Sequence, residues 1–182
     1  MTFAERWHPE TSLFHLSHGE VTITLEDVTC LMHIPIRGIL FGHGRLTKEE
    51  AREMLIEELG VDLKDALEEV ERTCGAHVRF HFLTRQYKAE LLTAHAGAGD
   101  EAEVDIHRQR VLRCYFLFLL GIQLFVDTSS SYTYVVYLRY LSDTARVHKY
   151  NWGAATLAYN YHRLIEGCFR KARIVASSCT LL

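Results

Sequence analysis

The chain has 182 residues, of which 48% are apolar and 24% are charged, and it contains only 2 prolines. This composition excludes an intrinsically disordered chain and is typical of one folded, helix-compatible domain that spans residues 1–182. The formal net charge of −3 argues against a general nucleic-acid coat protein, which would be strongly basic.

Charge is unevenly distributed along the chain. Residues 1–105 hold 10 Lys and Arg against 20 Asp and Glu, whereas residues 106–182 hold 10 Lys and Arg against 3 Asp and Glu. The asymmetry indicates either an acidic or nucleic-acid partner for the second half, or two halves that pack together and complement each other. We favour the second interpretation because it is the more ordinary one.

The 5 cysteines stand at positions 30, 74, 114, 168 and 179, without any C-x-x-C pair. Their odd number and wide spacing exclude a disulfide framework and a zinc ribbon, and they predict a reducing intracellular compartment. The N-terminus shows no signal segment. The strongest apolar run, Cys114–Val126, is shorter than the roughly 20 residues that a membrane-spanning helix requires, so we interpret it as part of a buried core helix.

A short β-hairpin is predicted near the N-terminus. Residues 14–16 and 21–23 alternate between apolar and polar side chains around a turn over residues 17–20, which is the pattern of two paired strands. A helix then begins at Thr24, because Asp27 follows three residues later as in a capping box. The next proline and glycine, at positions 35 and 38, are expected to end that element.

Three further helices are predicted in the middle of the chain. Thr47 and Glu50 form a capping box, and Gly60 ends the helix that they begin. Two more helices follow, one over an acidic segment that begins at Leu63 and one over residues 83–92, before a glycine-rich loop.

A long helix over residues 103–125 is predicted to lie at the centre of the core, because its second half is apolar nearly all round. The side chains expected to be buried are Leu112, Phe116, Leu119, Leu120, Leu124, Trp152 and Leu157. Residues 132–141 have a β-prone composition but are also compatible with a helix, and Asn151 caps a last helix through about Phe169. The predicted fold is therefore mainly α: a single helical domain with a small N-terminal β-hairpin and a central buried apolar helix.

The sequence contains no motif for catalysis, cofactor binding or metal binding. Its 11 histidines lack the spacings of zinc sites, and the glycines form no phosphate-binding or dinucleotide-binding motif. The carboxylates between residues 57 and 71 are interspersed with cations, and we interpret them as a solvated helix face rather than an acid–base or Mg²⁺ site. We predict a protein that is not an enzyme and has no catalytic residue, metal, cofactor or small-molecule substrate.

A tyrosine-rich segment next to basic residues leaves two interpretations open. The tyrosines at positions 132, 134, 137 and 140 can stack nucleic-acid bases above phosphate contacts, or they can pack at the rim of the core. Trp7 and Trp152 are interpreted as core anchors. The candidate nucleic-acid or partner contacts are Arg139, Arg146, Lys149, Arg170, Lys171 and Arg173.

Ordered strings along nearly the whole chain resemble the plant mobile domain of MAIN-like (maintenance-of-meristems-like) proteins. These strings are Glu5–Thr11, Phe14–Leu16, Thr22–Val28, Ile34–Gly38, Arg113–Gly121, Leu138–Leu141 and Tyr150–Tyr159. The signature residues, which we interpret as structural, are Trp7, Pro9, Glu10, Thr11, Phe14, Leu25, Asp27, Tyr140, Trp152 and Gly153.

The resemblance implies a nuclear interaction domain that supports meristem maintenance, genome stability and transposon silencing through protein–protein contacts. It implies a phosphatase-like protein or another MAIN-like family member as the partner. The alternative is a nucleic-acid-binding module derived from a transposable element, which would use the basic second half. The family is also described as aminotransferase-like, but no lysine of this chain lies in a recognisable pyridoxal-phosphate setting.

Family members usually continue into another apolar helix, so we expect this chain to be truncated at its C-terminal end. The apolar side chains of Val175, Leu181 and Leu182 would then leave apolar surface open. Such surfaces promote association, and we expect marginal stability or self-association through this region.

Overall fold

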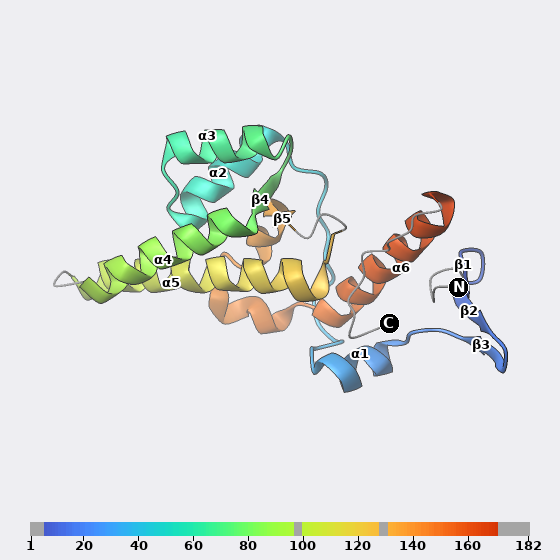
Figure 1. Cartoon of the computed structure of the whole chain (residues 1–182). Helices are drawn as coiled ribbons and strands as arrows, with labels where there is room; N and C mark the ends of the chain where they lie inside the picture. Colours follow the sequence, from blue (N-terminus) through green and yellow to red (C-terminus); the bar gives the residue numbers. More distant parts are fainter. Residues whose placement is uncertain (1–5, 97–99, 128–130, 171–182) are drawn as a thin grey trace. The chain divides into compact units, whose positions relative to one another are not determined.

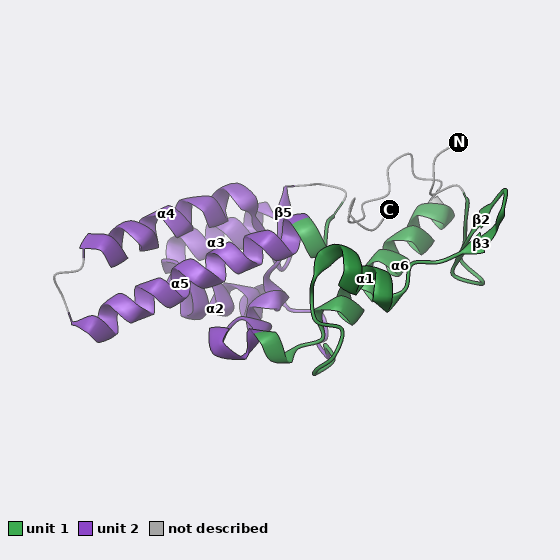
Figure 2. Ribbon diagram, turned by 90° about the horizontal axis from the view of Figure 1, so that it is seen from below, with its two compact units in different colours: residues 1–41, 123–128, 148–182 green, residues 42–122, 129–147 purple. Residues whose placement is uncertain are grey.

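The computed structural model describes residues 6–96, 100–127 and 131–170 (Figure 1). The chain forms two compact units: unit 1 comprises residues 1–41, 123–128 and 148–182, and unit 2 comprises residues 42–122 and 129–147 (Figure 2). Helices dominate and the sheets are small and antiparallel, so the predicted mainly α class is confirmed. One domain over residues 1–182 stays a prediction. Within the described ranges, every helix is too short or too polar to cross a membrane.

Unit 1 begins with a three-stranded antiparallel sheet of β1 (Trp7–His8), β2 (Leu13–Leu16) and β3 (Gly19–Val21). Strands β2 and β3 form the predicted hairpin, with a shorter turn than expected, because Leu16 pairs directly with Gly19. Strand β1 adds the pair Trp7 and Phe14, whose rings pack edge to face at 4.7 Å. Paired residues share one face of a sheet, so this pair points together into the core.

Two helices complete unit 1: α1 (Leu25–Met32) and α6 (Trp152–Arg170). The capping box predicted for α1 is present, since the Thr24 hydroxyl accepts from the Asp27 N–H at 3.2 Å and the Asp27 carboxylate accepts from the Thr24 N–H at 2.8 Å. Helix α1 ends at Met32, because the next residue, His33, has a left-handed φ of 54°. The helix therefore ends before Pro35, where the sequence predicted its end. Asn151 caps α6 as predicted, with its Oδ1 accepting from the Ala154 N–H at 2.9 Å.

The core of unit 1 packs the sheet against α1 and α6. Trp7 and Phe14 are almost fully buried, and they cluster with Ile23, Val28 and Leu164. Each such side chain contributes about 1.5–3 kcal/mol of burial free energy. The sheet is therefore held by its hydrophobic face more than by its few ladder hydrogen bonds.

Unit 2 is a helical assembly with one small sheet. Its helices are α2 (Lys48–Leu59), α3 (Leu63–Arg72), α4 (Phe80–Ala96) and α5 (Glu101–Leu119), and its strands are β4 (His77–Arg79) and β5 (Tyr132–Tyr134). A π-helix (Leu120–Leu124, η2) follows α5, and 3₁₀ helices cover Val135–Tyr140 (η3) and Thr144–Lys149 (η4). The capping box of Thr47 and Glu50 and the left-handed Gly60 stop on α2 are both confirmed. Residues 132–141 are thus half strand and half helix.

The long predicted helix changes geometry at Gly121, inside the π-helix. A Cβ atom at this position would lie 2.6 Å from the Thr133 Cβ and 2.7 Å from a ring carbon of Phe80. Strand β5 and helix α4 therefore approach the backbone of Gly121 closely, because this residue has no side chain. Wider π-turns inside helices commonly accommodate such local packing.

Burial along α5 is one-sided, which corrects part of the prediction. Leu117 and Leu120 are buried, as is Trp152 in unit 1, but the side chain of Leu112 is 40% exposed. The predicted burial of Leu112 is therefore wrong, because an apolar sequence all round a helix does not specify which face the neighbours cover. The side chains that are half-buried instead of buried are Phe116, Leu119, Leu124 and Leu157.

A buried carboxylate on α3 corrects the prediction of a solvated acidic face. Glu69 is 1% exposed, and its carboxylate accepts from the Arg79 backbone N–H at 2.7 Å and from the Arg79 guanidinium at 2.6 Å. The side chain therefore ties α3 to β4. Its exposed neighbour Glu68 pairs only with Arg72 one turn away, as expected for a solvated face.

Candidate functional site

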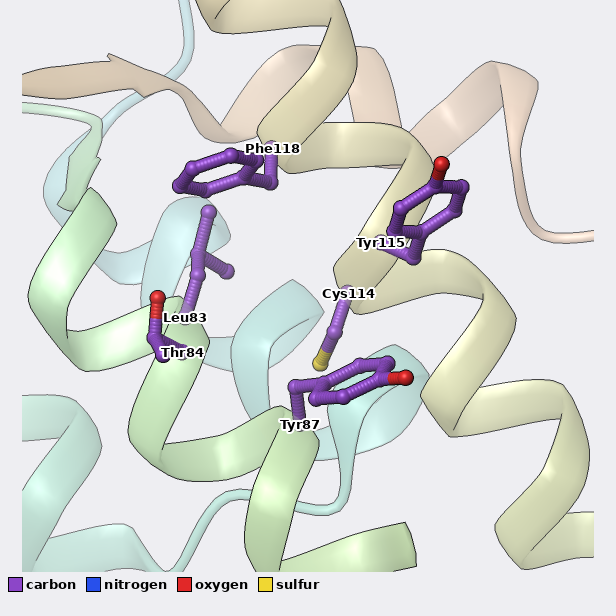
Figure 3. Close-up of a pocket in the computed structure, with 6 residues that line it drawn as sticks. All are labelled: Leu83, Thr84, Tyr87, Cys114, Tyr115 and Phe118. Atoms are coloured by element: carbon purple, nitrogen blue, oxygen red, sulfur yellow. The ribbon is translucent and has the colours of Figure 1, made fainter.

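An apolar groove lies between α4 and α5 on unit 2. Its volume is about 300 Å³. Figure 3 shows the six lining side chains: Leu83, Tyr87, Cys114 and Phe118 lie between the two helices, and the Tyr115 ring stands beside α5. The six residues are Leu83, Thr84 and Tyr87 of α4 and Cys114, Tyr115 and Phe118 of α5.

The groove follows from the residues that the two antiparallel helices place opposite each other. Residues 83 and 87, and likewise 114 and 118, are one helical turn apart and therefore share a face. The ring of Phe118 packs against the Phe80 ring at 5.2 Å and closes one end. Thr84 and Cys114 are small, so they leave space where a leucine pair would fill the interface.

The two tyrosines give the groove a polar rim. Tyr115 is 48% exposed and Tyr87 is half-buried. Within the described residues, neither hydroxyl makes a hydrogen bond to protein. A phenol group combines a large apolar ring with a hydrogen-bonding end, so both can contact a bound molecule through ring and hydroxyl together.

The floor of the groove is unreactive at neutral pH. Cys114 is 1% exposed, and burial, assisted by the charge of Glu90, raises the pKa of its thiol to about 12. Because the thiolate is the nucleophilic form, this cysteine is a small apolar wall residue at neutral pH. The groove therefore offers shape and contact surface, without a reactive group.

The two helix segments around the groove contain few acidic residues. Residues 80–96 and 106–124 contain a single acidic residue, Glu90, which is only 6% exposed. Its carboxylate lies 2.5 Å from His107 Nδ1 and 3.8 Å from a guanidinium nitrogen of Arg110. This carboxylate is therefore engaged inside the unit, and no acidic side chain of these segments is exposed beside Lys88 and Arg108.

The predicted basic contacts are distributed over both units. Arg139 lies 3.7 Å from Glu50, and Arg146 lies 4.0 Å from Asp143, both pairs being within unit 2. Lys149 is exposed and belongs to unit 1. The side chain of Arg170 and the whole of residues 171 and 173, which are Lys171 and Arg173, lie outside the described residues. Their roles as contacts stay predictions.

The tyrosine-rich segment is mostly packed inside unit 2. Tyr137 and Tyr140 are 6% and 8% exposed, and the Tyr140 hydroxyl lies 2.6 Å from His43 Nδ1. Burial, together with the charge of Arg139, lowers the pKa of His43. These two rings consequently have no open face on which a base could stack.

The signature residues lie mainly in unit 1, in packing or capping positions. The Trp7 ring lies 5.2 Å from the Tyr161 ring. The Gly153 N–H donates to the Pro35 carbonyl at 2.8 Å, and a Cβ on Gly153 would lie 2.6 Å from an Ile36 methyl. Trp152 packs against Phe41 at 4.8 Å. The exposed or half-exposed members are Pro9, Glu10, Thr11, Leu25 and Asp27, and their structural role stays a prediction.

Basic residues of the second half of the sequence pair with acidic residues of the first half inside unit 2. Arg113 lies 3.3 Å from a Glu58 carboxylate oxygen, and it also donates to the Glu58 and Ser142 carbonyls at 3.1 Å and 2.5 Å. The Arg110–Glu90 and Arg139–Glu50 pairs follow the same scheme. These contacts agree with the interpretation that the two halves complement each other.

The groove is not predicted by the sequence. The scarcity of acidic residues over 80–96 and 106–124 was visible in the sequence, and so were single tyrosines in the middle of both helices. Their meeting depends on the pairing of α4 with α5, which periodicity alone does not specify. Among the described residues, no group of three or more His, Cys, Asp or Glu is placed to hold a metal ion.

Comparison with known proteins identifies relatives over nearly the whole chain. A family model for the plant mobile domain matches residues 1–182. Protein MAIN-LIKE 1 of Arabidopsis thaliana is 30% identical over 178 residues, which are 98% of this chain and 33% of that protein. Protein MAINTENANCE OF MERISTEMS of the same plant is 28% identical over 178 residues, which are 98% of this chain and 34% of that protein.

A third relative has a different name. The Serine/threonine-protein phosphatase 7 long form homolog of Arabidopsis thaliana is 31% identical over 176 residues, which are 96% of this chain and 12% of that protein. The chain therefore spans about a third of the first two relatives and a smaller part of the third. No solved structure matches the chain significantly.

Proposed function

Because the chain belongs to the plant mobile domain family, as its sequence strings predict, we propose that it is a non-enzymatic protein-interaction domain. The observation that carries the proposal is the exposed apolar groove between α4 and α5, with a tyrosine in each wall. Tyrosine is enriched at protein interfaces and among the residues that dominate binding energy. A concave apolar site without a reactive group supports recognition more than chemistry.

We also propose a biological role. The chain is similar over 98% of its length to a protein named MAINTENANCE OF MERISTEMS and to MAIN-LIKE 1. On this basis, we propose that it acts in the nucleus, in support of meristem maintenance, genome stability and transposon silencing. A phosphatase-like protein or another MAIN-like family member is the partner that we propose, since a phosphatase 7 long form homolog carries a related segment.

One observation in the groove favours binding over catalysis. The buried Cys114 has a raised pKa that keeps its thiol protonated. Neither the sequence nor the groove presents a nucleophile beside a base. We therefore expect the purified chain to bind without turnover.

Nucleic-acid binding has less support. The tyrosines at 137 and 140 are buried, and Arg139 is close to an acidic side chain. The affinity of a nucleic-acid-binding module falls steeply as the salt concentration rises, and the logarithm of its binding constant decreases linearly with the logarithm of the salt concentration. Titrating labelled DNA and RNA at several salt concentrations distinguishes this alternative from protein binding.

The test of the proposed function is affinity capture from nuclease-treated plant nuclei, followed by reconstitution with the purified captured protein. We expect at least one protein to bind the chain directly after the nucleic acid has been removed. A capture that disappears with nuclease treatment, together with salt-dependent DNA or RNA binding by the chain alone, would overturn the proposal in favour of the alternative.

A further inference from the structure

We propose that the α4–α5 groove binds an acidic amphipathic helix of a partner protein. One large apolar side chain of that helix enters between Tyr87 and Tyr115, and its carboxylates face Lys88 and Arg108. This inference rests on the proposed function, and it adds both the surface and the chemistry of the partner.

The size of the groove indicates what fills it. A volume of about 300 Å³ is at the lower end of the roughly 300–1,000 Å³ of small-molecule pockets. It accommodates one or two apolar side chains. The groove lies between two antiparallel helices, and a third helix packs into such a groove with its side chains as ridges.

The apolar surface continues beyond the groove along α5. Leu112 and Tyr115 are 40% and 48% exposed, and their spacing of three residues places them side by side on one stripe of α5. A partner helix with anchors at i, i+3, i+4 and i+7 would cover this stripe while one anchor occupies the groove.

The charges beside the groove favour an acidic partner. Lys88 directly follows Tyr87 and lies one turn from Thr84, and Arg108 lies one turn from Leu112 on the exposed stripe. Both cations are exposed, and within the described residues neither has a hydrogen bond or ion pair. Glu90 is buried and already engaged, and the exposed Asp105 lies one turn further along α5 from the groove than Arg108. Residues 80–96 and 106–124 therefore present exposed cations without an exposed carboxylate, which complements carboxylates of a partner.

A second copy of this chain is a rival occupant. Helix α3 exposes Leu63 and Leu67 at 56% and 39%, with acidic neighbours in its sequence. We favour a separate partner because Asp65 and Glu68 of α3 already pair with Arg85 and Arg72. A dimer that forms at micromolar concentration and is abolished by Tyr115→Ser would overturn this choice in favour of self-association.

The test uses the whole chain and two labelled synthetic helical peptides of about 18 residues, a length at which helices begin to persist in water. Both carry leucine at i, i+3, i+4 and i+7. One has glutamate and the other lysine at the positions that flank the leucines, where they can face Lys88 and Arg108. Fluorescence anisotropy should show that the glutamate peptide binds at least about tenfold more tightly, a difference of roughly 1.4 kcal/mol.

Charge reversal supplies the matched variants. The double change Lys88→Glu and Arg108→Glu should weaken the glutamate peptide about tenfold and strengthen the lysine peptide. Lys64→Glu reverses an exposed cation on α3 and should change neither affinity. Tyr115→Ser should weaken both peptides by about tenfold, and circular dichroism checks that its helix content is retained.

The outcomes separate this inference from the proposed function. If both peptides bind equally, or if Lys64→Glu acts like the double reversal, the acidic-helix inference is wrong. If Tyr115→Ser loses the peptide but still retains the captured nuclear partner in full, the groove is not the partner's site and the interaction function stands. A wild-type chain that captures no nuclear protein overturns the interaction function itself.

Discussion

Replacing Glu69 with alanine is expected to destabilise the protein much more than replacing its neighbour Glu68. Glu69 is 1% exposed, and its two oxygens accept from the Arg79 backbone N–H, Nε and a terminal guanidinium nitrogen at 2.7, 3.1 and 2.6 Å. The carboxylate therefore satisfies a backbone donor at the end of β4 and neutralises a cation at the same time.

The magnitude follows from what the substitution leaves behind. The Arg79 N–H loses its acceptor, and an unsatisfied buried donor costs about 1–3 kcal/mol. The Arg79 side chain is 37% exposed, so water can reach its guanidinium after the carboxylate is removed. The loss of stability from the broken ion pair therefore stays below the roughly 3–5 kcal/mol that breaking a fully buried pair costs. We expect Glu69→Ala to lower the free energy of unfolding by about 2–4 kcal/mol.

Glu68→Ala is the matched control. Glu68 pairs with Arg72 on the exposed face of the same helix, and such i, i+4 pairs contribute about 0.3–0.5 kcal/mol. Urea unfolding followed by circular dichroism, with linear extrapolation, gives both free energies. If Glu69→Ala costs no more than Glu68→Ala, the reasoning that Glu69 anchors α3 to β4 is refuted. Glu69→Gln should lie between the two, because it keeps an acceptor for the backbone N–H.

Three further predictions address α5 and its surroundings. Leu117→Ala removes a fully buried side chain and should lower the free energy of unfolding by about 2–5 kcal/mol. Leu112→Ala, at a 40% exposed position, should lower it by less than about 1 kcal/mol. Equal melting temperatures for the two variants would contradict the one-sided burial of α5. Gly121→Ala places a methyl 2.6 Å from a threonine Cβ and should destabilise by about 1–3 kcal/mol, while Gly42→Ala, with nothing within 4 Å, should have little effect on the midpoint of unfolding. Because burial raises the pKa of Cys114 to about 12, iodoacetamide at pH 8 should alkylate it far more slowly than the exposed cysteines, and peptide mapping that finds equal rates would contradict this burial.

Local signals in the sequence predicted local structure well. The capping boxes at Thr24 and Thr47 and the cap at Asn151 are present, because each depends on residues at most three positions apart. Gly60 ends α2 as expected, since its φ of 67° suits a residue without a Cβ. Features that need only a few neighbouring residues can therefore be recognised without any tertiary information.

Tertiary contacts decided what the sequence could not. Strand β1 has only two residues and is recognisable only once Trp7 has Phe14 beside it. The π-helix at Gly121 lies where Phe80 and Thr133, far away in the sequence, approach its backbone. The buried Glu69 resembled its exposed neighbours in sequence, since burial of a carboxylate depends on the partner that the fold supplies.

The two faces of α5 connect these differences with the proposed function. The sequence from Cys114 onward is apolar nearly all round, and a helix of this kind is expected to be covered on every side. Unit 2 covers one side, through Leu117, and leaves Leu112 and Tyr115 open to solvent within the described structure. Within residues 106–124 no acidic residue lies on that open side, and the nearest exposed carboxylate before it on α5 is that of Asp105. Covering this side with apolar side chains therefore desolvates little charge. An apolar stripe bordered by cations is therefore better satisfied by a partner that brings apolar side chains and carboxylates together than by a nucleic acid, which brings phosphates but few apolar anchors.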